Sequence, residues 1–215
     1  MTEQRDRFLR SEGDAWYQRN ETAPPSVATA RIAANLRPGQ AILEVGCADG
    51  RNLAALAAQT PGRYVGVEPS AAAVAAGRER WPMLELRTGT AEELPFEAGT
   101  FDVVILGFFL YLADRTLLPR IVAETDRVLR DGGLLAIVDF DPPSPRRRPY
   151  HHAHGLSSYK MDHARLFLAF PSYALQEKMA FHHGGEGWAR DEDERLALNL
   201  LRKDVAGGYP DSPTP

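Results

Sequence analysis

The sequence has little cysteine and no long apolar run. Its one cysteine, Cys47, can form neither a disulfide within the chain nor a cysteine-rich metal cage, which fits a reducing compartment. No apolar run reaches the roughly 18 to 20 residues that a membrane-spanning helix needs. The opening MTEQRDRFLRSEGD contains no apolar signal core. We therefore expect a cytoplasmic protein with no membrane partner.

An excess of positive charge is also absent. The chain has 25 lysines and arginines against 29 aspartates and glutamates, and its net charge is −4. Non-specific nucleic-acid binding depends on a broad basic surface, so we expect no DNA partner. The expected partner is a small molecule, and the expected state is a monomer or a homodimer.

Short apolar runs alternate with helix-like stretches, which is typical of α/β proteins. The expected buried strands are residues 41–45, 63–68, 84–88, 101–107 and 133–140. Apolar residues at helical spacing predict helices over residues 52–59, 70–80 and 116–130. Two further strands, 173–183 and 194–203, are predicted as an antiparallel edge pair, because Leu196, Leu198 and Leu200 alternate with period two. Together these elements predict a Rossmann-like, doubly wound sheet of seven strands, mostly parallel with an antiparallel C-terminal edge hairpin.

The organisation predicted is one domain over residues 1–205 with a flexible tail at 206–215. Residues 1–24 form an N-terminal arm that we expect to act as a lid. Residues 141–172 are expected to be a substrate loop followed by a helix, because DPPSPRRRPYHHAHG is too long for a routine connection.

The stretch AILEVGCADG (41–50) ends the first strand where open α/β sheets bind ligands. Gly46 and Gly50 allow a tight turn and a close approach to a ligand. A dinucleotide site is one interpretation, but it needs the spacing GxGxxG, and Arg51 stands where its third glycine would be.

The spacing Glu44-x-Gly46-x-Ala48-x-Gly50 resembles motif I of the class I S-adenosylmethionine-dependent methyltransferases, of the type 11-like group. YVGVEPS, TGTAEELPFEAGTFDVVILGFFLYL and LRDGGLLAIVDF follow in that family's order, so the resemblance covers about residues 41–140. It implies S-adenosylmethionine as cofactor, S-adenosylhomocysteine as product, and Glu68 as acceptor of hydrogen bonds from the two ribose hydroxyls. The cofactor contacts that the resemblance implies in this region are Glu44, Gly46, Cys47, Ala48, Gly50, Asn52, Glu68, Pro69, Thr90, Ala91, Glu92, Leu106, Gly107 and Phe108.

The adenine contact departs from the family pattern. The family often has an aspartate at the position of Thr90, so Thr90, Glu92 or backbone groups would have to reach the adenine amino group.

The segment EGDAWYQRN (12–20) resembles, more loosely, an element of methylases associated with pseudaminic acid biosynthesis. That similarity implies that Tyr17, Arg19 and Asn20 cover the methionine end of the cofactor, with Arg19 facing its carboxylate. Trp16 and Tyr17 could equally form a hydrophobic staple of a helix.

The histidine-rich loop supplies candidates for a general base. A hydroxyl or ammonium nucleophile must lose a proton around the time it attacks a methyl group, and histidine titrates near neutrality. We therefore assign catalysis to His152 or His154, with Tyr150 beside them. A metal site is the alternative, but H-H-x-H in a loop does not by itself bring three ligands together, and we predict no metal.

The run Arg146, Arg147 and Arg148 could be a solvated surface or could clamp an anionic substrate, with Tyr111 as a further substrate contact. The leading hypothesis is therefore methyl transfer to an O or N atom of a small, anionic molecule, such as a secondary metabolite or sugar derivative. The alternatives are a methyltransferase acting on a peptide, protein or RNA, and a non-catalytic binding subunit that keeps the fold.

Overall fold

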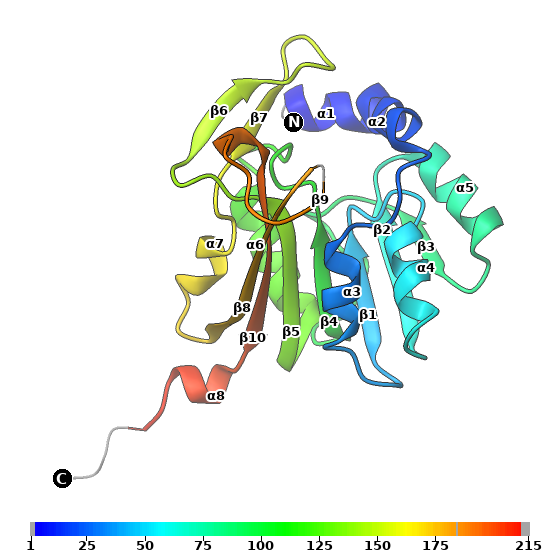
Figure 1. Cartoon of the computed structure of the whole chain (residues 1–215). Helices are drawn as coiled ribbons and strands as arrows, with labels where there is room; N and C mark the ends of the chain where they lie inside the picture. The colour runs from blue at the N-terminus through cyan, green and yellow to red at the C-terminus, as the bar shows by residue number, and fades with distance from the viewer. Residues whose placement is uncertain (1–2, 184, 212–215) are drawn as a thin grey trace.

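The computed structural model describes residues 3–183 and 185–211. Its centre is a sheet with the strand order β3-β2-β1-β4-β5-β10-β8-β9 (Figure 1). Five neighbouring strands are parallel. They are β1 (Ala41–Val45), β2 (Arg63–Glu68), β3 (Glu85–Thr88), β4 (Phe101–Gly107) and β5 (Leu129–Phe140). The predicted α/β class and the mostly parallel, Rossmann-like sheet are confirmed.

The C-terminal strands run against the rest of the sheet. β8 (Tyr173–His182) and β10 (Arg195–Lys203) pair antiparallel, and β10 also pairs antiparallel with β5. The predicted edge hairpin is confirmed, and a two-residue strand, β9 (Gly185–Glu186), extends it. The 3-10 turn η2 (Glu192–Glu194) leads directly into β10.

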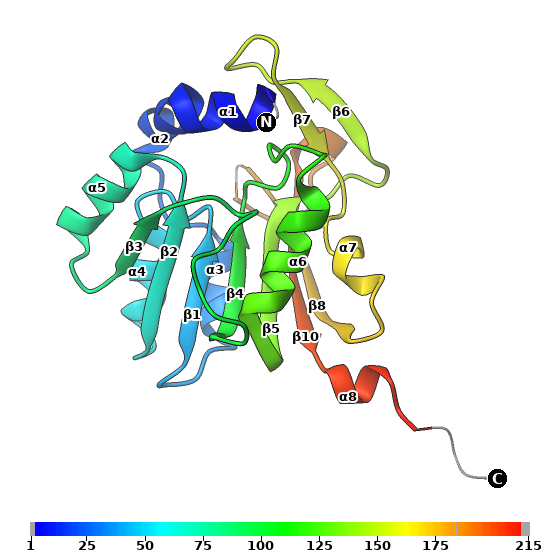
Figure 2. The ribbon, with the colours of Figure 1, turned by 180° about the vertical axis from the view of Figure 1, so that it is seen from behind.

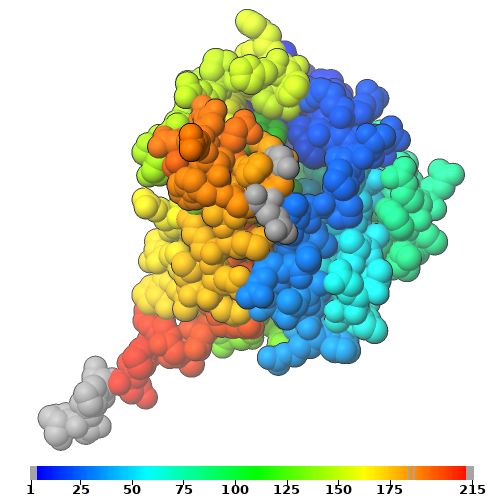
Figure 3. Space-filling view, in the orientation of Figure 1, coloured from blue at the N-terminus to red at the C-terminus, as the bar shows by residue number. Residues whose placement is uncertain are grey.

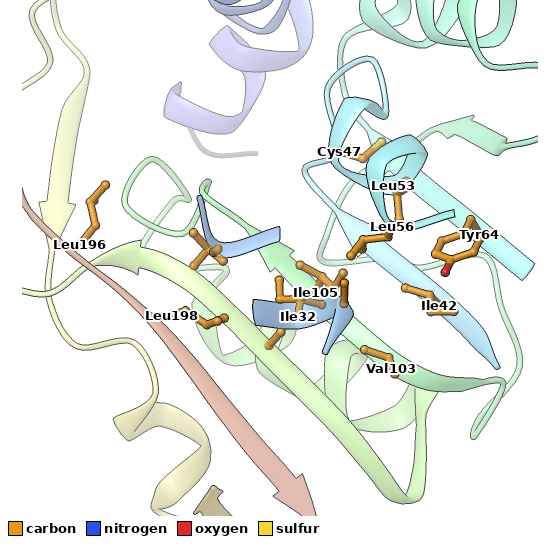
Figure 4. Packing of buried hydrophobic residues seen from close by; sticks show 14 of the residues in the cluster. Ile32, Ile42, Cys47, Leu53, Leu56, Tyr64, Val103, Ile105, Leu196 and Leu198 are labelled. Carbon is orange, nitrogen blue, oxygen red and sulfur yellow. The ribbon is translucent and has the colours of Figure 1, made fainter. Parts of the chain in front are cut away.

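Helices cover both faces of the sheet. One face packs against α3 (Ala28–Ala33), α4 (Arg51–Ala57) and α5 (Ala71–Arg80), through buried residues that include Ile42, Leu53 and Ile105 (Figure 4). The other face, seen in Figure 2, packs against α6 (Leu118–Val128) and α7 (Arg165–Leu168). Ile42 and Leu43 point to opposite faces because side chains alternate along a strand, and this explains the continuous apolar runs.

The edge of the sheet where the parallel strands end is covered by two separate pieces of chain. One is the N-terminal arm, built from α1 (Glu3–Arg7), a π-helical turn η1 (Phe8–Glu12) and α2 (Gly13–Asn20). The other is a hairpin of β6 (Arg146–Pro149) and β7 (Ser157–Lys160), which forms its own two-stranded sheet (Figure 1). Asp14 of the arm accepts a hydrogen bond from Ser70 at 2.5 Å, just beyond β2.

Three local expectations were wrong. The stretch expected as a loop contains strand β6, because the backbone of 146–149 pairs with 157–160. The helix expected over 161–170 is the single turn α7, and Ala164 donates to the Asp162 side chain at its start. β5 begins at Leu129 rather than 133, with a register shift against β4 before the two strands pair regularly.

The C-terminal region begins with a helical turn, α8 (Val205–Gly208), inside the stretch expected as a flexible tail. Residues 212–215 of that tail, and residues 1–2 of the expected arm, lie outside the described residues. Within residues 3–183 and 185–211, no helix has the length and apolarity needed to span a membrane.

Candidate active site

The turn after β1 depends on glycine at residue 46. Gly46 has a φ of +75°, and a Cβ at this position would lie 2.8 Å from a ring carbon of Phe109. Its backbone N–H donates to the carbonyl of Val67 in β2 at 2.8 Å. Neither the left-handed backbone nor the close approach tolerates a larger side chain. The turn therefore places bare backbone at the point where β1 and β4 meet and the strand order reverses.

Glu68 ends β2 beside this turn. Its carboxylate accepts hydrogen bonds from the backbone N–H groups of Ala48 and Ser70, each at 3.0 Å. Burial raises the pKa of the Glu68 carboxyl to about 7. A carboxylate has roughly four lone-pair positions, so two backbone donors leave room for two more. Two neighbouring hydroxyls of a bound ribose fit that remaining capacity.

Glu44 lies inside the sheet on the other side of the turn. Asn52 donates to its Oε1 at 2.9 Å, while the buried Oε2 atom has no hydrogen-bond partner. Burial raises the pKa of this carboxyl to about 8. A buried polar atom without a partner is costly unless a ligand supplies one. With a pKa of about 8 the carboxyl is largely protonated at neutral pH, so Oε2 can donate its proton to a ligand or, when ionised, accept from a ligand N–H or O–H.

Two cavities meet at this edge of the sheet. They share four wall residues: Trp16, Gly46, Gly107 and Phe108. The smaller cavity is also lined by the predicted residues Glu68, Pro69, Thr90, Ala91 and Glu92. The larger, about 1060 Å³, is also lined by the predicted residues Arg19, Asn20, Glu44, Cys47, Ala48, Asn52, Tyr111, Arg148, Tyr150 and His152. In the view of Figure 3, the blue N-terminal helices lie at the upper right and the orange segment before β10 lies at the left.

Other predicted residues do not line either cavity. They are Tyr17, Gly50, Leu106, Arg146, Arg147 and His154. Gly50 has a φ of +80° and starts α4, and Leu106 is buried in the sheet. Burial raises the pKa of the Cys47 thiol, so this residue packs as a small apolar side chain.

In the smaller cavity, the side chain of Glu92 already has a hydrogen-bond partner. Its carboxylate accepts a hydrogen bond from the Arg5 side chain of the N-terminal arm. Thr90 and Ala91 line the same cavity and follow directly after β3. Because Glu92 already pairs with Arg5, Thr90 and the backbone beside it are the more available groups for an adenine contact.

In the arm, Trp16 faces the cavities and Tyr17 does not. Tyr17 is buried with its hydroxyl unpaired, whereas Trp16 lines both cavities. Arg19 lines the larger cavity, but its guanidinium pairs with Glu12 and donates to the Tyr150 hydroxyl at 3.1 Å. Arg19 thus ties the arm to the hairpin.

Of the three arginines of the hairpin, Arg146 and Arg148 both pair with Asp193 on one side, and Arg147 points elsewhere. Arg146 pairs with Glu192 at 2.6 Å, and Arg148 pairs with Asp193 at 2.9 Å. Arg147 donates instead to the Ser157 hydroxyl at 2.9 Å and lies outside the larger cavity. These acidic partners were not predicted, although they lie in the conspicuous acidic run Asp191-Glu192-Asp193-Glu194.

The histidines of the hairpin also lie in different places. The rings of Tyr150 and His152 lie 5.3 Å apart at the larger cavity. His154 lies at the hairpin turn, where its carbonyl accepts a hydrogen bond from Arg7. Among the described residues, no group of three or more His, Cys, Asp or Glu side chains is placed to hold a metal ion.

Several cavity residues were not assigned to the site from the sequence. Phe140, Lys160 and His183 all line the larger cavity. Phe140 and His183 each end a predicted strand, which was the available signal. Lys160 comes from β7, a strand that was not predicted.

The glycine turn, the buried carboxylate after β2 and the paired cavities lie together at the edge of a Rossmann-like sheet where open α/β sheets bind ligands. Residues 42–133 match the model of the methyltransferase domain family. A probable S-adenosylmethionine-dependent methyltransferase of Mycolicibacterium smegmatis is 27% identical over 94% of this chain and 76% of its own length. Over residues 42–133 the chain is therefore similar to the methyltransferase domain family, and over most of its length it is similar to a probable S-adenosylmethionine-dependent methyltransferase.

Two further comparisons agree. The uncharacterized methyltransferase sll0829 of Synechocystis is 34% identical over 51% of this chain, and the chain spans about half of that relative's length. The 1,6-didemethyltoxoflavin-N1-methyltransferase of Burkholderia thailandensis superposes with a TM-score of 0.72 at 18% identity, covering 93% of this chain and 87% of its own. These relatives give no support to the looser similarity with pseudaminic acid methylases.

The arm and the hairpin are expected to respond together to cofactor. Gln4 donates to the carbonyl of Leu112 at 2.6 Å and to that of Ser157 at 2.9 Å, so the arm bridges the loop after β4 and the hairpin. These few contacts can open locally. We expect S-adenosylhomocysteine to slow amide exchange in residues 3–20 and 146–160 about tenfold, measured by mass spectrometry. Exchange equally slow with and without it would contradict a closing role.

Proposed function

We propose that the chain transfers a methyl group from S-adenosylmethionine to an O or N atom of a small molecule. When bound, that cofactor supplies an electrophilic methyl group on a sulfonium. The observation that carries the proposal is the wall shared by the two cavities. Glu68 lines one of them, and Glu44, whose Oε2 has no partner, lines the other, so the methyl donor and the methyl acceptor can meet at Gly46 and Phe108.

The chain's own task is to orient the two reactants and to exclude water. Holding the nucleophile in line with an already electrophilic carbon supplies most of the acceleration in such a reaction. Trp16 of the arm and Tyr150 of the hairpin cover the larger cavity from two sides. This enclosure supports a small acceptor over a peptide or an RNA.

The toxoflavin-type relative adds support for a small acceptor. Its crystal structure contains bound 1,6-didemethyltoxoflavin together with S-adenosylhomocysteine. The direct test is incubation of the chain with S-adenosylmethionine carrying a labelled methyl group and a panel of small O–H and N–H compounds. Label transfer to a small compound supports the proposal, and transfer confined to added protein or RNA would contradict it.

The affinity for the cofactor is expected to rise with pH. The pKa of Glu68 is about 7, so below that value the carboxyl is protonated and accepts fewer hydrogen bonds. Ribose hydroxyls would favour the carboxylate, and binding should release a proton. We expect an affinity gain of up to about tenfold per pH unit below the pKa. Calorimetry at about pH 6 and pH 8, in buffers of different ionisation enthalpy, measures both effects.

The stability of the ligand-free protein has the opposite trend. The folded-state pKa of Glu68 lies above the ordinary value of 4.5. Protonated Glu68 therefore contributes fully to the free energy of unfolding below pH 4.5, and this contribution is lost as the pH rises through about 7. The cofactor-induced rise in Tm should consequently be larger at pH 8 than at pH 6. An affinity that does not change with pH would contradict a contact between Glu68 and the cofactor.

We further propose that the acceptor carries an anionic group, held by Arg148. This arginine lines the larger cavity, and its side chain is 53% exposed beside its partner Asp193. Arg148→Ala is expected to raise KM about tenfold for an acceptor with a carboxylate, with little effect on cofactor affinity. Arg147→Ala is the matched control, because Arg147 lies outside the cavity. Equal KM values for wild type and Arg148→Ala would leave the arginines a structural role only.

A further inference from the structure

Four rings form one continuous wall in the larger cavity. The ring centroids of Phe108 and Phe140 lie 5.3 Å apart, and that of Tyr111 lies 4.8 Å from Phe108 and 5.0 Å from Phe140. The imidazole of His183 stands edge-on to Phe108 at 5.4 Å and to Phe140 at 5.2 Å. All four line the larger cavity. Such rings favour a flat partner, because stacked and edge-to-face contacts add to simple apolar burial.

The wall begins where methyl transfer would occur. Phe108 also lines the smaller cavity, so it stands at the junction of the two. Its φ of +57° is unusual for a residue with a side chain. Its N–H donates to the carbonyl of Val138 at 2.9 Å, which helps to hold this conformation. Strained backbone of this kind is concentrated at functional sites, where the surrounding structure maintains it.

The charges around the wall are suited to an acidic hydroxyl. Lys160 lies with its Nζ 3.8 Å from the centroid of the Phe140 ring, and it donates to the carbonyl of Asp193 at 2.6 Å. A fixed ammonium beside the rings favours a developing phenolate. Phe140 and Lys160 come from different sheets, so the site exists only when the hairpin is in place.

His183 is a neutral base in this setting. His183 is exposed overall, but the partial desolvation of its imidazole lowers its pKa; the charges that face it are Glu194, which raises the pKa, and Lys160 and His182, which lower it. A histidine with a lowered pKa is unprotonated at neutral pH and can accept a proton. His152, by contrast, lies against Tyr150 on the hairpin.

We propose that the methyl acceptor is a flat aromatic molecule with a phenolic O–H or a ring N–H, that it stacks on Phe108 beside Phe140, and that His183 accepts its proton. The acceptor atom gives an electron pair to the methyl carbon, the carbon–sulfur bond breaks, and its electron pair stays on sulfur. The proton goes to a ring nitrogen of His183. This assignment rests on the methyl-transfer function proposed above.

Binding tests the aromatic class without knowledge of the natural acceptor. The probes are 2-naphthol and its fully saturated analogue decahydro-2-naphthol, titrated by calorimetry into the protein saturated with S-adenosylhomocysteine. We expect 2-naphthol to bind at least about tenfold more tightly than the saturated alcohol. Equal affinities, or no binding of 2-naphthol, would overturn the aromatic assignment.

Two variants locate the probe. Phe140→Leu should weaken the binding of 2-naphthol about tenfold, whereas Phe167→Leu should leave it unchanged. Both phenylalanines are buried, but Phe167 packs in the cluster on the opposite face of the sheet. If Phe140→Leu does not fold, Phe108→Leu makes the same test. Unchanged affinity in the folded variant would place the probe elsewhere.

The pH profile tests His183. With S-adenosylmethionine and 2-naphthol, His183→Gln should lower kcat at pH 7 by about 100-fold or more. The rate of this variant should then rise with pH toward the ionisation of the phenol itself, a recovery that mere structural damage would not produce. The same loss and recovery in His152→Gln, with a wild-type profile for His183→Gln, would instead assign the base to His152 and overturn this proposal. Equal profiles for wild type and His183→Gln would exclude His183 as the base.

Failure of this assignment can be separated from failure of methyl transfer itself. If the protein binds S-adenosylmethionine and methylates a saturated compound but no phenol or ring N–H compound, the aromatic assignment is wrong and the proposed function stands. If S-adenosylmethionine does not bind at all, the proposed function fails first.

Discussion

Glu68→Ala is expected to weaken the binding of S-adenosylmethionine by about 100-fold or more. Each charge-assisted hydrogen bond to a ribose hydroxyl is worth about 1.5–3 kcal/mol, and about 1.4 kcal/mol corresponds to tenfold in affinity. The carboxylate also accepts the backbone N–H groups of Ala48 and Ser70, so its loss loosens the turn that forms the shared wall. Both effects act in the same direction.

Glu85→Ala is the matched control for this variant. Glu85 lies on the neighbouring strand β3, and its exposed carboxylate pairs with Arg63 at 2.8 Å. Removing it should change the dissociation constant less than about twofold, because an exposed ion pair contributes little. Calorimetry on both folded variants decides the matter. An unchanged dissociation constant for Glu68→Ala would mean that the ribose is held elsewhere.

Asp49→Ala is expected to lower the free energy of unfolding by about 3–5 kcal/mol. The Asp49 side chain is fully buried and pairs with Arg51 at 2.7 Å and with Arg80 at 3.1 Å. Arg51 is itself only 13% exposed and donates to the carbonyl of Asn20 at 2.7 Å, so it joins the turn to the end of α2. Without Asp49, the Arg51 charge would lie largely buried and uncompensated.

Urea denaturation measures this loss, with two further variants to separate its causes. Arg80→Ala should cost about 1 kcal/mol or less, since that side chain is 46% exposed. Asp49→Ala combined with Arg51→Met should recover part of the stability, because the uncompensated charge is then gone. A loss below about 1 kcal/mol for Asp49→Ala would show that this buried pair is not needed for the turn.

The parallel part of the fold could be predicted because its signals are local. The strands β1, β4 and β5 contain continuous apolar runs, and Gly46 marks a turn where the chain adopts a positive φ. The order of motifs along residues 41–140 then identified the cofactor edge. Strand β6 could not be recognised in this way, since an Arg-Arg-Arg-Pro strand on a small exposed hairpin has no apolar alternation.

The cofactor half of the site was more predictable than the acceptor half for a related reason. Glu68 is placed by its own strand, whereas the partner of Arg148 is Asp193, which lies far along the chain. Which side of α2 faces the cavities, Trp16 or Tyr17, depends on how the arm docks and not on its own sequence. His183 joins Phe108 and Phe140 only after three separate strands are assembled.

A calorimetric titration of the ligand-free protein with S-adenosylmethionine, S-adenosylhomocysteine and NAD tests the central claim most directly. We predict saturable heats and dissociation constants of the order of micromolar for the first two, with a rise in Tm that increases with ligand concentration by mass action. NAD should give neither, because Arg51 stands where a dinucleotide turn needs its third glycine. Heat and a Tm shift with NAD alone would contradict the assignment of this site to S-adenosylmethionine.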